Sequence, residues 1–275
     1  MSTANTRTGA PTTGANISTP TALVTGASSG IGAVYARRLA RRGHDLVLVA
    51  RDAARLETLA SELRTQAGVK VEVLPADLTQ SRDRLAVEAR LRADPPIGLL
   101  VNNAGAAAPG GFTDADPDRL ENLIQLNVVA LTRLTSAVLP GMLTRGGGAI
   151  VNVASVLGLA PEIAFGIYGA TKAFVLSLSQ SLAAEVGGRG IYVQAVLPAA
   201  TRTEIWQRSG RDLSAIQGVM EVDELVDAAL VGFDRREPVT IPPLPDEGQW
   251  RAFEAARQAM LPNFRQEHAA ARYRA

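Results

Sequence analysis

Tyr168 and Lys172 are the residues of this chain whose types and spacing most directly indicate chemistry. They stand four positions apart in a segment with a helical pattern, which places both side chains on one helix face. A positive charge beside a tyrosine favours the phenolate, so the phenol can give or take a proton nearer neutral pH. Carbonyl reduction needs such a group. An exposed pair without function is the alternative interpretation.

A serine hydroxyl is expected to face the same pocket. Ser155 follows the apolar strand 149–154, and ligands of open α/β sheets bind at the carboxyl ends of strands. There the hydroxyl can donate to a substrate oxygen on which negative charge develops; its alternative role is to cap a turn. Asn127 lies in the apolar run 123–131, where a buried amide needs a partner, and taken alone it indicates a structural hydrogen bond.

The run TGASSGIG at residues 25–32 stands between a strand and an amphipathic helix. Glycines in that context let backbone N–H groups and the helix dipole approach a pyrophosphate. The loop therefore predicts a bound dinucleotide, and a tight turn capped by Ser28 or Ser29 is the alternative. The second strand ends at Ala50 and is followed by Arg51, where an acid would select a ribose 2′-hydroxyl. Arginine favours NADP over NAD because it can bind a 2′-phosphate, although it also fits a solvated loop, and Asp52 fits a helix cap.

Short β-branched runs alternate with helical patterns from Thr21 onward, which predicts an α/β fold. We expect a single doubly wound Rossmann-type domain with a parallel seven-stranded sheet between helices. The predicted strands are 22–25, 46–50, 69–74, 99–102, 149–154, 191–197 and 239–241, and the predicted helices are 31–42, 52–66, 80–93, 117–138, 166–187 and 222–234. The predicted organisation is a disordered N-terminal extension at 1–20, a dinucleotide-binding catalytic domain at 21–241 and a C-terminal helical appendage at 242–275, packed on the domain or on a neighbouring subunit.

The composition narrows the classes of partner. A net charge of +1 provides no global field for nucleic acid or an anionic membrane. The chain has no cysteine and only His44 and His268 as imidazole ligands, so a metal site is not expected. No apolar run reaches the roughly 20 residues that span a bilayer. The N-terminal residues lack the apolar core of a secretory signal. We therefore expect a cytoplasmic enzyme with a small-molecule substrate.

These motifs occur in order over residues 20–240 and resemble the short-chain dehydrogenase/reductase superfamily in its non-extended form. The resemblance implies a catalytic tetrad in which Tyr168 is the acid/base, Ser155 orients the carbonyl, Lys172 holds the nicotinamide ribose and tunes Tyr168, and Asn127 anchors a water in the proton relay. It also implies that Asp77 contacts adenine and that residues 102–105 support the sheet and cofactor. The cofactor contacts that it implies are Gly26, Ser28, Ser29, Gly30, Ile31, Gly32, Arg51, Asp77, Leu78, Asn103, Ala104, Gly105, Tyr168, Lys172, Pro198, Thr201 and Thr203. One departure is the run Pro198-Ala199, where the family has Pro-Gly.

We expect an NADP-dependent carbonyl reductase or alcohol dehydrogenase that assembles as a homodimer or homotetramer. Its substrate pocket is expected between residues 156–165 and 201–220. Apolar side chains there (Leu157, Leu159, Phe165, Ile205 and Trp206) favour a hydrophobic ketone or alcohol, or else serve core packing. The arginines of that region (Arg202, Arg208 and Arg211) fit either a binding site for an anionic group of the substrate or a solvated surface. A 3-ketoacyl-CoA or 3-ketoacyl carrier protein reductase is the first alternative function, and a non-catalytic NADP-sensing regulator is the second.

Overall fold

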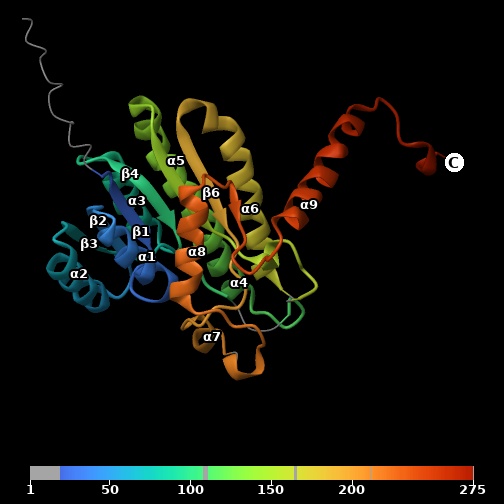
Figure 1. The fold of residues 1–275 in the computed structure, drawn as a ribbon. Coiled ribbons are helices and arrows are strands. Elements are labelled where there is room, and N and C mark those ends of the chain that lie inside the picture. Colours follow the sequence, from blue (N-terminus) through green and yellow to red (C-terminus); the bar gives the residue numbers. More distant parts are fainter. Residues whose placement is uncertain (1–18, 108–110, 164–165, 211, 275) are drawn as a thin grey trace, which may run out of the picture.

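A parallel sheet forms the centre of the computed structural model, which describes residues 19–107, 111–163, 166–210 and 212–274 (Figure 1). Its seven strands over these residues have the order β3-β2-β1-β4-β5-β6-β7, with every neighbouring pair parallel. The strands are β1 (Thr21–Thr25), β2 (Leu46–Ala50), β3 (Val71–Pro75), β4 (Ile97–Asn102), β5 (Gly148–Val153), β6 (Ile191–Val196) and β7 (Val239–Thr240). The order reverses between β1 and β4, so a crevice is expected at the carboxyl ends of these strands. The predicted fold class is confirmed.

Helices cover both faces of the sheet, as the nearly continuous apolar strands require. On one face lie α1 (Gly30–Arg41), α2 (Ala53–Ala67) and α8 (Val222–Asp234), and on the other lie α3 (Ser81–Arg92), α5 (Leu131–Arg145) and α6 (Ile167–Val186). Each face has its own buried hydrophobic cluster. The sheet thus separates two cores, and the carboxyl ends of its strands are the expected place for a functional site.

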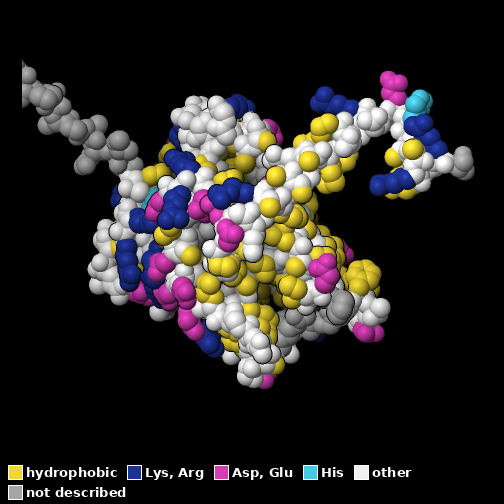
Figure 2. All heavy atoms as spheres, turned by 45° about the vertical axis from the view of Figure 1, so that its right-hand side comes forward, with side chains coloured by type: hydrophobic (Ala, Val, Ile, Leu, Met, Phe, Trp, Pro, Cys, Tyr) yellow, Lys and Arg dark blue, Asp and Glu magenta, His cyan; other side chains and the backbone are white. Residues whose placement is uncertain are grey.

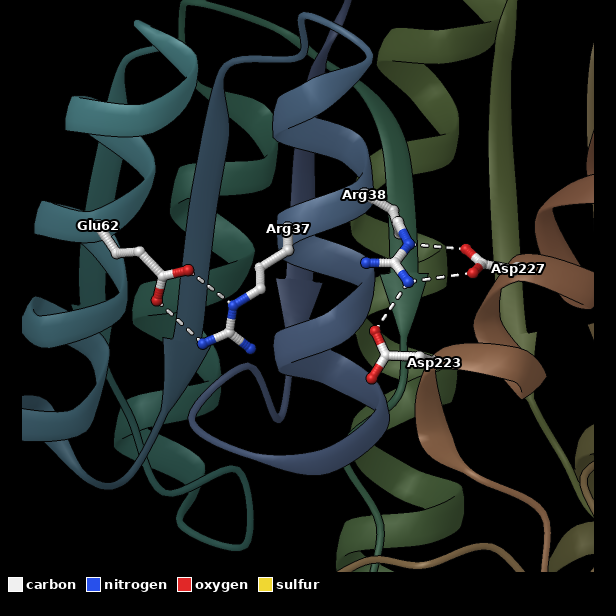
Figure 3. A network of polar contacts seen from close by, with 5 residues as sticks. All are labelled: Arg37, Arg38, Glu62, Asp223 and Asp227. Carbon is white, nitrogen blue, oxygen red and sulfur yellow. Dashed lines mark hydrogen bonds and ion pairs between the residues drawn. The ribbon is translucent and has the colours of Figure 1, made fainter.

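Ion pairs hold α1 between its two neighbouring helices (Figure 3). The guanidinium of Arg37 donates to both carboxylate oxygens of Glu62 on α2 at 2.9 and 3.0 Å. On the other side, Arg38 donates to Asp223 and Asp227 of α8 at 2.6 to 3.0 Å. Exposed pairs contribute little stability individually, but these fix the position of the helix whose N-terminus carries the glycine loop.

The predicted helix 117–138 is wrong in two respects: the segment is not one regular α-helix, and it does not end at residue 138. The structure has α4 (Pro117–Ile124), a π-helical turn (Gln125–Ala130) and then α5, which runs on to Arg145. Proline usually ends a helix, yet Pro140 lies inside α5 because the buried side chains around it hold the helix on the sheet. Length and composition alone would let Pro117–Arg145 cross a membrane; the packing of α5 against α3 and β4 accounts for its apolar residues.

The two ends of the chain differ from one another. Residues 1–18 of the predicted extension lie outside the described residues. At its end, the carbonyl oxygen of Pro20 lies 2.6 Å from Nδ1 of His44. The predicted C-terminal appendage contains α9 (Glu247–Ala259), which projects away from the domain (Figure 1).

The predicted strand 69–74 is displaced to β3 at Val71–Pro75.

Candidate active site

The glycine loop is tied to the carboxyl end of β4. Oγ1 of Thr25 accepts hydrogen bonds from the backbone N–H groups of Asn103 and Ala104, both at 3.0 Å. The Asn103 amide donates to the Thr25 carbonyl oxygen at 2.8 Å. Gly26 has φ +66°, and a side chain at Gly32 would overlap the carbonyl oxygen of Gly26. Both positions therefore require glycine, and the loop has the shape that the sequence predicted.

The N-terminus of α1 has the features of a phosphate site. Ser29 is its N-cap residue but makes no side-chain capping bond, and the first turn contains no acidic residue. Backbone N–H groups at a helix start need acceptors, and the helix dipole favours an anion there. The loop residues thus fit the pyrophosphate of a dinucleotide. Ile31, also predicted as a contact, packs partly against the core below.

Thr201 and Thr203 occupy different places. Thr201 is buried and its hydroxyl donates to the carbonyl oxygen of Ala199 at 3.0 Å, so it serves the turn itself. The methyl group of Thr203 would lie 3.3 Å from a side chain on Gly30, so Thr203 lies beside the glycine loop. Ala199 replaces the usual glycine without strain, because Arg236 is the only non-glycine residue with positive φ in the described part of the chain.

The adenine side of the predicted site is formed by two loops. Arg51 is exposed after β2, and the Asp52 side chain accepts from the backbone N–H of Arg55 at 3.0 Å, so Asp52 caps α2. Beyond β3, Oδ1 of Asp77 accepts from the N–H and hydroxyl of Thr79 at 2.9 and 2.8 Å. Leu78 is buried in the core, so any contact with a cofactor is made through its backbone.

Close backbone packing brings Ser155 to Tyr168. A short 3₁₀ turn (Val156–Gly158) follows Ser155 and rests on α6, where a side chain at Gly158 would lie 2.9 Å from the backbone of Lys172 and a side chain at Gly169 would lie 3.0 Å from the carbonyl oxygen of Leu157. The Ser155 hydroxyl accepts from the N–H of Leu157 at 3.2 Å, lies 3.3 Å from the Pro198 carbonyl oxygen and is hydrogen-bonded to the Tyr168 side chain. The two hydroxyls can therefore act on one substrate oxygen.

Lys172 is buried beside this pair. Its Nζ donates to the carbonyl oxygen of Val153 at 2.8 Å and lies 5.7 Å from the centroid of the Tyr168 ring. Burial lowers the pKa of Lys172 to about 8, because a charged ammonium loses its hydration there. A side chain on Gly105 would lie 3.4 Å from Nζ, so the glycine keeps open the space next to the ammonium.

The pKa of Tyr168 differs from the sequence-based expectation. Burial raises it to about 12, and the hydrogen bond with Ser155 opposes this only in part. Loss of hydration is the largest influence on this pKa, although the ammonium of Lys172 lies 5.7 Å from the centroid of the ring. At neutral pH the phenol is protonated, which is the form that donates a proton.

Asn127 lies in the π-helical turn, where its side chain joins two loops of the site. Oδ1 accepts from the N–H of Ala106 at 2.9 Å, and Nδ2 donates to the Ala106 carbonyl oxygen at 2.9 Å and to Oγ1 of Thr171 at 3.1 Å. Thr171 in turn donates to the carbonyl oxygen of Tyr168 at 2.7 Å. The structural interpretation of Asn127 is therefore supported, since its hydrogen bonds hold the segments that carry Tyr168 and Gly105. Its place in a proton relay stays a prediction.

Asn102, which the resemblance assigns to the support of the sheet, begins a buried polar chain below the site, and sequence reasoning missed the other members. The amide of Asn102 donates to Thr135 of α5 at 3.0 Å and to Asn152 of β5 at 2.9 Å. Asn152 donates onward to Ser179 of α6 at 2.9 Å. Polar residues inside apolar strands were the available signal, because buried amides must be paired. Thr171, next to Lys172, carried no such signal.

A cleft of about 1020 Å³ opens beside the glycine loop. It is lined by Ser28 and Ser29, by α2 residues including Arg55, and by the segment after β6 with Glu204 and Trp206. The described lining does not include the predicted catalytic residues Ser155, Tyr168 and Lys172. Trp206, predicted at the substrate pocket, lines this cleft together with the glycine loop. Phe165 and Arg211 lie outside the described residues.

Comparisons with known proteins agree with this geometry. The family model of the short chain dehydrogenases matches residues 20–214. A solved short-chain dehydrogenase from Sphingobium yanoikuyae in complex with NADPH is 62% identical, with a TM-score of 0.91 over 93% of this chain and 100% of that one. The bulky-bulky ketone specific alcohol dehydrogenase from Comamonas testosteroni is 54% identical, with a TM-score of 0.87 over 93% of this chain and 99% of that one.

Among curated proteins, a very-long-chain 3-oxoacyl-CoA reductase of Anas platyrhynchos is 39% identical over 191 residues, which are 67% of this chain and 60% of that protein. This chain thus spans well under two thirds of that relative's length. The matched family model covers most of the chain, including the glycine loop and all four predicted catalytic residues. The protein belongs to the short-chain dehydrogenase family.

Proposed function

We propose that this protein uses NADP(H) to interconvert hydrophobic ketones and secondary alcohols. The observation that carries the proposal is the contact between Ser155 and Tyr168 beside the buried ammonium of Lys172. When bound, the nicotinamide supplies the hydride that reduces the carbonyl carbon. The Tyr168 phenol donates the proton to the carbonyl oxygen, and the Ser155 hydroxyl stabilises the negative charge that develops on that oxygen.

Lys172 and Asn127 organise this proton donor. The ammonium of Lys172 stands beside the ring, where it can hold the ribose of the cofactor and favour the phenolate that remains after donation. Asn127 fixes the start of α6 through Thr171. Since burial raises the pKa of Tyr168 to about 12, the phenol holds its proton at neutral pH and can donate it in the reduction. Oxidation accelerates as the pH rises, because it needs the phenolate.

The substrates that we propose are ketones that carry two bulky apolar groups. Support comes from the apolar residues of the 3₁₀ turn and from the likeness to the Comamonas testosteroni alcohol dehydrogenase. The test is a panel of bulky aryl ketones, small ketones and their alcohols, followed by nicotinamide absorbance with NADPH and NADH. Turnover of small ketones alone would contradict the bulky class, and tight NADPH binding without any turnover would favour the regulator.

A 3-oxoacyl-CoA reductase is the second candidate, favoured by the similarity to the Anas platyrhynchos enzyme. Coenzyme A carries phosphates that need basic side chains near the pocket. Arg202, which follows β6, is paired with Glu221 at 2.7 Å, but both side chains are largely exposed, and such pairs contribute little net stability, so Arg202 stays available to a phosphate. Acetoacetyl-CoA in the same assay separates the two candidates, since efficient turnover of it would select the acyl-CoA function.

Self-association is part of the proposal, as a homodimer or homotetramer in the cytoplasm. No residue of α9 is buried, and its apolar side chains continue beyond the helix (Figure 2). Phe253, Met260, Leu261 and Phe264 are 50%, 49%, 48% and 70% exposed. Trp250 packs against the core and Gln180 of α6 donates to Glu254 at 3.0 Å, which holds α9 on the domain. The exposed apolar side chains further along need another cover, and a second copy is the one that we propose. Light scattering at micromolar concentration tests this, and a monomer refutes it; cell fractionation tests the location.

A further inference from the structure

Arg84 is a buried arginine in the first turn of α3, where it is 8% exposed. It shares the buried face of the helix with Val87 and Leu91, a position at which an apolar side chain would fit. Burial of a guanidinium is costly unless its charge and its donors are paired. Within the described part of the chain, no carboxylate pairs with Arg84 and its buried Nε has no partner. Stability alone therefore does not explain this arginine.

The contacts that Arg84 makes are with the loop after β3. Its Nη1 donates to the backbone carbonyl oxygens of Leu78 at 2.9 Å and of Thr79 at 2.6 Å. From the same turn of α3, Oδ2 of Asp83 accepts from the backbone N–H of Asp77 at 2.8 Å. The start of α3 thus holds residues 77–79, the loop that is expected to contact adenine.

The polar groups of this loop can be accounted for one by one. The carbonyl oxygen of Asp77 accepts from the N–H of Gln80 at 2.9 Å, and Oδ1 of Asp77 accepts from the N–H and the hydroxyl of Thr79. Among the described residues, the N–H of Leu78 and Oδ2 of Asp77 are left without a partner. The Asp77 carbonyl and the Leu78 N–H belong to one trans peptide and point in opposite directions, so this N–H points away from the turn that Gln80 closes.

We propose that Arg84 is a positioning residue that sets the preference of the site for adenine over hypoxanthine. The inference rests on the proposed function, because it assumes that NADP(H) binds along the glycine loop with its base at residues 77–79. Adenine presents the acceptor N1 beside the N6 amino donor, which complements the Leu78 N–H and Oδ2 of Asp77. Hypoxanthine presents a donor at N1 and an acceptor oxygen at C6, so it opposes both groups. Arg84 ties down the two neighbouring carbonyls and so keeps this donor and this acceptor in place.

Equilibrium binding without turnover tests the proposal. The probes are NADP and its analogue with hypoxanthine in place of adenine, each titrated by calorimetry into the intact chain. The unmodified protein should prefer NADP by about tenfold or more, since hypoxanthine leaves the two polar groups of the loop unmatched. Arg84→Met should lower the affinity for NADP about tenfold and that for the analogue less than about twofold. Arg84→Lys keeps a donor for the two carbonyls and should retain most of the preference. The matched control is Arg82→Met, at an exposed position of the same turn, which should leave the preference unchanged.

Hydrogen exchange gives a readout that needs no variant. The Leu78 amide of the unmodified protein should exchange more slowly with NADP bound than with the analogue bound. Equal exchange in the two complexes would overturn the inference, and this result is measurable even if Arg84→Met does not fold. An unchanged preference in Arg84→Met, or equal losses of affinity for both nucleotides, would also overturn the role of Arg84 while leaving the proposed function intact. Failure of the unmodified protein to bind NADP or NADPH would overturn both.

Discussion

Replacement of Lys172 by methionine should change how stability depends on pH. Lys172 is 5% exposed, and burial lowers its pKa from 10.5 to about 8. Between these values the unfolded chain binds more protons than the folded one, so the free energy of unfolding rises with pH. Below the folded value the ammonium is charged in both states, and its full burial cost opposes folding. Lys172→Met removes this titration.

The magnitude follows from the two pKa values. Their difference corresponds to about 3 kcal/mol, since one unit is worth about 1.4 kcal/mol. From about pH 7 to about pH 9.5, the unmodified protein should gain about 2 kcal/mol relative to Lys172→Met. Loss of the bond to the Val153 carbonyl oxygen adds a cost that does not depend on pH, so the slope isolates the buried charge.

Urea unfolding followed by tryptophan fluorescence measures this slope in the absence of cofactor. The chain supplies its own control, because its other lysine is the exposed Lys70. The free energy of unfolding of Lys70→Met, plotted against pH, should run parallel to that of the unmodified protein across the whole pH range. A Lys172→Met curve that is also parallel would refute the reasoning, because it would mean that the ammonium is hydrated in the folded state.

Three further substitutions test the site. Tyr168→Phe removes one hydroxyl, so turnover should fall about 10²–10⁴-fold while NADPH affinity is retained. Steady-state rates measure the turnover and calorimetry measures the affinity. A near-normal rate would exclude Tyr168 as the acid/base. Arg51→Asp should weaken NADPH binding at least about tenfold and leave NADH binding nearly unchanged, which parallel titrations measure; equal losses would argue against a 2′-phosphate contact. Gly32→Ala should abolish binding of both cofactors, because a methyl group overlaps the Gly26 carbonyl oxygen; unaltered titrations would show that the loop relaxes.

Alternation of short apolar runs with amphipathic segments was enough to predict the sheet and most helices, because each buried strand and each helix face has its own periodicity. The prediction failed where tertiary packing overrides a local rule. The predicted helix ends at residue 138, but α5 continues through Pro140 to Arg145 against the sheet. The π-helical turn was also invisible, since one wide turn leaves the apolar pattern almost unchanged.

The candidate site was predictable where a residue type is rare and its spacing is fixed. Tyr168 and Lys172 share a helix, and the Ser155 side chain reaches that of Tyr168, which brings together three residues that the sequence assigned to one pocket. The direction of the Tyr168 pKa was not predictable, because burial and the distance to the ammonium depend on the folded surroundings. Arg55 and Glu204 form an ion pair between residues 149 positions apart, and no local pattern marks such a contact.

The wide turn at Gln125–Ala130 also has a consequence for insertions and deletions. It acts as one surplus residue within a helix. Deleting one residue there would give a uniform helix whose downstream part keeps its orientation, because the wide turn already absorbs the surplus residue. Leu134 and Val138, buried in the core, would still face the sheet. Deleting a residue from the regular part of α5 would instead turn everything beyond it by about 100° and carry such side chains out of the core. The wide turn is therefore the place in this long helix where the packing tolerates the loss of one residue, and the cost falls on the backbone around Asn127.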